Sequence, residues 1–152
     1  MKRISLNIKE FQLKISVALR ENDTDNAIKI CHEYLDKNIE KWMAYEKLAL
    51  VYLIRSEWRQ AINFSRKAIS LNKQTAQSWS SLGIAYKNSG KYKEAIAAYE
   101  QALAILPESE VVLSNLGLVY WKLNKFDEAK LRIKKALKIR KSFPEATYNL
   151  GK

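Results

Sequence analysis

Residues 79–107 read WSSLGIAYKNSGKYKEAIAAYEQALAILP. The first half of this segment places large apolar and small residues at the spacing i, i+3, i+4 and i+7, which collects them on one face of an α-helix. They are Trp79, Leu82, Gly83 and Tyr86. The second half, from Tyr92 onward, repeats this spacing after the turn signal Asn88-Ser89-Gly90. We therefore predict an antiparallel pair of helices at about residues 76–89 and 92–106.

This pattern returns every 34 residues along the chain. A fixed period of this length marks a repeat architecture, in which stacked units bury one continuous core. The recurring positions are Ala27, Ala61, Ala95 and Ala129; Leu48, Leu82, Leu116 and Leu150; Tyr52, Tyr86 and Tyr120; Ala68, Ala102 and Ala136; and Gly83, Gly117 and Gly151. We assign copies at about 8–41, 42–75, 76–109 and 110–143, followed by a partial fifth copy or cap at 144–152.

The copy that contains Trp79 is similar to the motif of the tetratricopeptide-repeat family, with Tyr99 in place of Phe and with Pro107 closing the repeat. The resemblance covers nearly the whole chain. It implies an all-α, right-handed superhelical solenoid of antiparallel helix pairs, with about four repeats plus a terminal helix in one domain spanning residues 1–152. We expect helices at about 8–21, 24–38, 42–55, 58–71, 76–89, 92–106, 110–123, 126–140 and 144 to the end.

The two ends of the array depart from the pattern. The first copy has Lys14 and Ala18 where its siblings have Leu and Tyr, so we expect it to pack less well on the second copy. The fifth copy stops with its motif just begun, which favours a fragment of a longer array. It also leaves Tyr148 and Leu150 without a covering second helix, so the sequence predicts self-association through the carboxy-terminal end.

Composition limits the classes of protein that fit. The 152 residues include one cysteine and one histidine, so neither a disulfide framework nor a Cys/His metal site can form within one chain. No apolar run approaches the roughly 18 residues that a membrane helix needs, and we expect a soluble, cytoplasmic protein with no membrane insertion. The net charge of +11 favours acidic partners or nucleic acid without selecting one.

Candidate catalytic groups are few. Cys31 and His32 are adjacent, so on a helix their side chains point about 100° apart and do not form a nucleophile and base pair. We expect a half-buried thiol and a surface imidazole. The carboxylate pairs at helix starts, such as Asp23 with Asp25 and Asp127 with Glu128, are typical of caps. We predict no enzyme activity, no cofactor and no metal site.

Most aromatic residues occupy recurring positions and are predicted to pack in the core: Trp79, Tyr52, Tyr86, Tyr120, Tyr92, Trp58 and Phe126. Trp121 differs, because it lies about 100° round its helix from the packing stripe. In the proteins that the chain resembles, first helices line a concave surface that holds an extended peptide or a partner helix. That groove would here include Lys47, Leu50, Ile54, Ser81, Ile84, Lys87, Asn88, Asn115, Leu118, Trp121, Lys122 and Asn149. Asn115 and Asn149 each offer a donor and an acceptor to a ligand backbone.

The sequence thus predicts a non-catalytic protein-interaction scaffold that binds a peptide segment or partner helix in this groove. An alternative is a substrate-recruiting segment of a larger enzyme, such as a glycosyltransferase or methyltransferase. A lesser alternative is nucleic acid on a convex basic ridge formed by Lys130, Arg132, Lys134, Lys135, Lys138, Arg140 and Lys141. We do not favour it, because no aromatic residue interleaves these cations to stack bases. The two-carboxylate clamp of chaperone-tail adaptors in the family is not supplied by any set of three consecutive copies.

Overall fold

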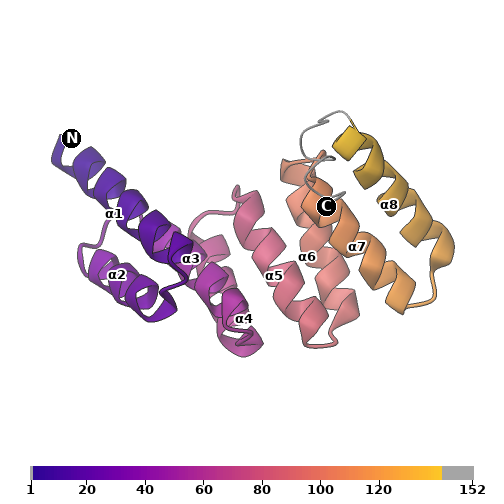
Figure 1. Cartoon of the computed structure of the whole chain (residues 1–152), viewed down its shortest axis with the longest axis horizontal. Coiled ribbons are helices and arrows are strands. Elements are labelled where there is room, and N and C mark those ends of the chain that lie inside the picture. Colours follow the sequence, from indigo (N-terminus) through magenta and orange to yellow (C-terminus); the bar gives the residue numbers. More distant parts are fainter. Residues whose placement is uncertain (1, 142–152) are drawn as a thin grey trace.

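The computed structural model describes residues 2–141, which form helices joined by short turns and contain no strand (Figure 1). The helices are α1 Lys2–Arg20, α2 Thr24–Asp36, α3 Lys41–Ile54, α4 Trp58–Leu71, α5 Ala76–Asn88, α6 Tyr92–Ile105, α7 Glu110–Lys122 and α8 Phe126–Lys141. The prediction is wrong for α1, which begins at Lys2 rather than near residue 8. The helix predicted from residue 144, with Tyr148, Asn149 and Leu150, lies outside the described residues.

The helices pair along the chain and stack into one elongated array (Figure 1). Each pair packs on the next through its second helix, so that α4 contacts α5 and α6 contacts α7. The first helices of successive pairs also meet, since α3 contacts α5 and α5 contacts α7. These three helices therefore form one layer, and we call its outward-facing surface the inner face of the solenoid. No helix among the described residues is both long enough and apolar enough to cross a bilayer.

Small residues bring the helices of a pair close together, as the sequence predicts. A methyl group on Gly83 would lie 2.5 Å from the ring of Tyr99 on α6. At the same position of the next repeat, a methyl group on Gly117 would lie 2.6 Å from Cγ1 of Ile133 on α8. Real Cβ atoms do not approach so closely, so each glycine is required by the side chain opposite it.

The turn inside each repeat has the same backbone conformation, although its residue type varies. Asn22, Ser56, Gly90 and Asn124 lie 34 residues apart and have φ values of 55°, 58°, 77° and 60°. The residue after each turn residue donates its N–H to a carbonyl of the preceding helix at 2.9 Å; Lys91 to Tyr86 is one example. This is the hydrogen bond of a Schellman cap, which ends one helix and aims the chain into the next.

Candidate functional site

The structure places most of the predicted groove residues at the surface of α3, α5 and α7. Lys47, Leu50, Ile84, Lys87 and Asn115 are half-buried, and Ile54, Asn88, Leu118, Trp121 and Lys122 are exposed. Ser81 is the exception and corrects the prediction, because none of its surface is exposed. Its short side chain ends between the helices, where its hydroxyl accepts a hydrogen bond from Nε2 of Gln77 at 3.2 Å. We therefore leave Ser81 out of the site.

The carboxy-terminal part of the inner face carries an apolar patch. Leu118 is 51% exposed and Trp121 is 57% exposed, and both project from α7 one turn apart. The Trp121 ring meets the ring of Phe126 edge to face, with 4.7 Å between their centroids. Large apolar side chains at the surface that contact one another are typical of an interaction site.

Phe126 itself corrects a prediction, because it is 48% exposed rather than packed in the core. Its siblings Trp58 and Tyr92 are half-buried and each is followed by another repeat. Among the described residues no repeat follows α8, so the surface of Phe126 stays open. The ring therefore enlarges the patch around Trp121.

Lys87 and Asn115 join α5 to α7 beside this patch. Nζ of Lys87 donates a hydrogen bond to Oδ1 of Asn115 at 2.7 Å. The amide of Asn115 also donates from Nδ2 to the carbonyl of Val111 at 3.0 Å. Asn115 thus already uses one acceptor and one donor within the chain, and it keeps one lone pair and one N–H for a ligand.

The charge of Lys87 lacks an acidic partner. Partial burial lowers the pKa of the Lys87 ammonium, and within residues 2–141 no carboxylate forms an ion pair with it. The predicted groove set contains three lysines and no Asp or Glu. Glu46, next to Lys47 on α3, accepts hydrogen bonds from the hydroxyls of Thr75 and Ser78, so it is occupied in linking α3 to α5.

The basic ridge of α8 is narrower than the sequence predicts. Arg132 is half-buried, with its guanidinium 5.7 Å from the centre of the Tyr120 ring. Arg140 is also half-buried and forms an ion pair with Glu110 on α7. The two arginines thus attach α8 to α7, and the cations that remain exposed on α8 are Lys130, Lys134, Lys135, Lys138 and Lys141.

The candidate nucleophile does not form a catalytic site. Cys31 has no exposed surface, where the sequence predicts a half-buried thiol, and burial raises its pKa to about 12. The thiol therefore stays protonated at neutral pH, while the adjacent His32 is exposed. Asp23 caps α2 as predicted, since its carboxylate accepts a hydrogen bond from the N–H of Asn26 at 3.1 Å. No group of His, Cys, Asp and Glu side chains that could hold a metal ion occurs in the described part of the chain.

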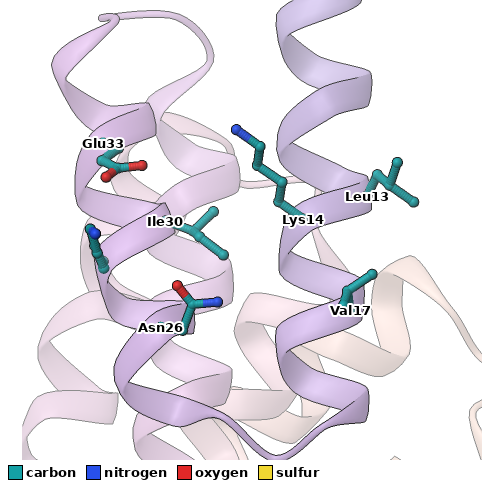
Figure 2. Close-up of a pocket in the computed structure, with 7 residues that line it drawn as sticks. Leu13, Lys14, Val17, Asn26, Ile30 and Glu33 are labelled. Carbon is teal, nitrogen blue, oxygen red and sulfur yellow. The ribbon is translucent and has the colours of Figure 1, made fainter.

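A cleft of about 470 Å³ lies between α1 and α2, and sequence reasoning did not find it. Figure 2 shows Ile30 pointing from α2 towards α1, while Lys14 extends from α1 near the mouth of the cleft. Lys14 takes the place of the buried leucines of the later repeats, and its ammonium pairs with Glu10 at 2.7 Å. A charged end group turned outward leaves unfilled the space that a leucine would occupy. The signal was the departure of Lys14 from its register.

Helix pairs that cross at small residues, repeat after 34 positions and share one turn conformation define an α-solenoid repeat protein. The family model described as "Tetratricopeptide repeat" matches residues 44–108 and 74–142. The chain therefore belongs to the tetratricopeptide-repeat family, and the family resemblance of the sequence is confirmed.

Solved structures of MamA share this fold. The structure described as "Crystal structure of MamA" is 25% identical to this chain, covers 93% of it and 81% of its own chain, and aligns with a TM-score of 0.77. A second, "MamA 41-end from Desulfovibrio magneticus RS-1", is 19% identical, covers 88% of this chain and 75% of its own, and has a TM-score of 0.77. At that identity the second likeness shows the fold alone. A search of curated proteins finds no match.

Proposed function

We propose that this protein-interaction scaffold is non-catalytic and binds a peptide segment or a partner helix along its inner face. The observation that carries the proposal is the exposed pair of rings, Trp121 and Phe126, beside the amide of Asn115. Exposed aromatic side chains supply large contact area, and an amide with spare hydrogen-bonding capacity can bind a ligand backbone. Both kinds of group are supplied by α7 and by the start of α8.

The test uses a partner identified by cross-linking to the full chain and measured by calorimetry. Trp121→Ala removes the anchor and is expected to weaken binding by about 2 kcal/mol or more, which is about 30-fold in Kd. The matched control is Lys134→Ala with Lys135→Ala on the ridge, which is expected to change Kd little. Because Trp121 is mostly exposed, its removal is expected to leave the thermal midpoint nearly unchanged. Undiminished binding by Trp121→Ala rejects the inner-face mode.

A second proposal concerns self-association through the carboxy-terminal end. Leu137 on α8 is 46% exposed, whereas Ile69, its sibling two repeats earlier, is 8% exposed under the helix that follows it. The apolar surface that joins one repeat to the next is thus open on α8 among the described residues. A second copy of the chain that covers this surface would bury the same kind of side chain that each internal junction buries.

A further inference from the structure

The inference begins with the position of Lys87 in the repeat. Its siblings at the same register are the apolar residues Leu53 and Trp121, so the repeat pattern does not require a cation there. The side chain is half-buried and its charge faces only the neutral oxygen of Asn115, 2.7 Å away. Placing a charge in a partly desolvated position without an opposite charge is unfavourable. A stable fold therefore gains nothing obvious from this lysine.

Other half-buried cations of the chain have acidic partners. The guanidinium of Arg55 contacts Asp25 at 3.0 Å and Glu57 at 2.8 Å, and Arg140 pairs with Glu110. The helices that flank Lys87 cannot supply a partner in the same way. The sequence of α5 contains no acidic residue, and Glu110 is the acidic residue of α7.

We propose that Lys87 is a recognition residue that pairs with a carboxylate of the bound peptide, so that the inner face selects acidic, apolar segments. This inference rests on the proposed function and names the chemistry of its ligand. The ammonium donates one of its three N–H groups to Asn115 and keeps two for a carboxylate. Leu118 and Trp121 lie one and two turns along α7 from Asn115, so the acidic side chain of the ligand is expected next to a large apolar one.

Charge complementarity extends beyond this one contact. Lys47 and Lys122 belong to the same surface, and Glu46 is held by Thr75 and Ser78. A ligand with a negative charge therefore meets only cations along α3, α5 and α7 in this set. Lys87 also lies outside the positions of the family's two-carboxylate clamp, so one carboxylate against one lysine is a different mode of recognition.

The experiment uses the full chain on an array of random 12-residue peptides, half with free and half with amidated carboxyl ends. Bound peptides are expected to be enriched in Asp or Glu next to Leu, Phe or Trp, and the enrichment in acidic residues is expected to disappear with Lys87→Gln. The tightest peptide, labelled with fluorescein, then measures Kd. We expect Lys87→Gln to weaken it about tenfold or more and Lys87→Arg to restore most of the affinity, because a charge-assisted hydrogen bond is replaced.

Controls separate this inference from the proposed function. Lys91→Gln, which removes an exposed lysine after the same helix, is expected to leave Kd unchanged, and thermal melts verify that each variant is folded. Peptides that need Trp121 but bind equally well to Lys87→Gln overturn the role of Lys87 and leave the inner-face site standing. An array with no enriched peptide overturns both. Loss of binding on amidation assigns the contact to a terminal carboxylate, and retention assigns it to a side chain; either result supports the pairing.

Discussion

Replacing Gly83 by alanine adds one methyl group where α5 lies against α6. The new Cβ would lie 2.5, 2.6 and 2.9 Å from three atoms of the Tyr99 ring. That ring has no exposed surface, so it cannot turn into solvent to make room. In an open helix the same change stabilises by about 1 kcal/mol, because alanine has the higher helix propensity. Overpacking a buried contact costs about 1–3 kcal/mol, so we expect a net loss of up to about 2 kcal/mol.

Gly117→Ala is the matched control, because it makes the same change at the same register one repeat later. Its Cβ would lie 2.6 Å from Cγ1 of Ile133, a side chain that is half-buried on α8 and has space to move. The gain in helix propensity remains, while the cost of the contact falls. We therefore expect Gly117→Ala to exceed Gly83→Ala in free energy of unfolding by about 1–2 kcal/mol.

Urea unfolding followed by circular dichroism measures this difference. A third variant identifies its origin, since the second repeat places Ala49 and Ser65 at the registers of Gly83 and Tyr99, and both are fully buried. In a Tyr99→Ser background the ring is absent, so Gly83→Ala is expected to stabilise by about 1 kcal/mol. If Gly83→Ala is the more stable of the two single variants, or if its effect does not change sign in this background, the reasoning is refuted.

Three further predictions concern the turns, the thiol and the end of the array. Ser56→Gly relieves a left-handed residue at φ 58° and is expected to raise the free energy of unfolding by about 1 kcal/mol, whereas Ser70→Gly within exposed α4 should lower it. Burial raises the pKa of Cys31 to about 12, so folded protein at pH 8 should resist iodoacetamide and unfolded protein should react. Since the unfolded thiol loses its proton first, this group should also reduce stability between about pH 9 and pH 12, seen as a falling urea midpoint. Sedimentation should show self-association at several hundred micromolar that Leu137→Lys weakens, and a strictly monomeric parent chain would exclude it.

The period of 34 residues predicted the helices from α2 to α8 to within two residues of each end. The period is this informative because each copy repeats the same apolar and small positions. It could not place the start of α1, since residues before the first copy have no sibling, and no proline or glycine stops the helix there. It also missed the common turn conformation, because Asn22, Ser56 and Gly90 share tolerance of a backbone shape rather than a side chain.

The candidate site shows the same limit. Helical phase predicted that Trp121 leaves the packing stripe, and the side chain is mostly exposed. Phase gives the direction of a side chain but not the distance to the neighbouring helix, so it wrongly left Ser81 at the surface. The partnerless charge of Lys87 could not be found from sequence either, because it depends on which side chains α7 places opposite α5.

The exposed side of α1 makes the two ends of the stack different. Later repeats bury Ala44 and Leu48, Ser78 and Leu82, or Val112 and Leu116 at the registers where α1 carries Glu10 and Lys14 as an exposed ion pair. A repeat joined ahead of α1 would have to desolvate that pair, whereas one joined after α8 would cover Leu137. Engineered versions of this protein can therefore be lengthened by duplicating units on the α8 side, and the array has a built-in direction of growth.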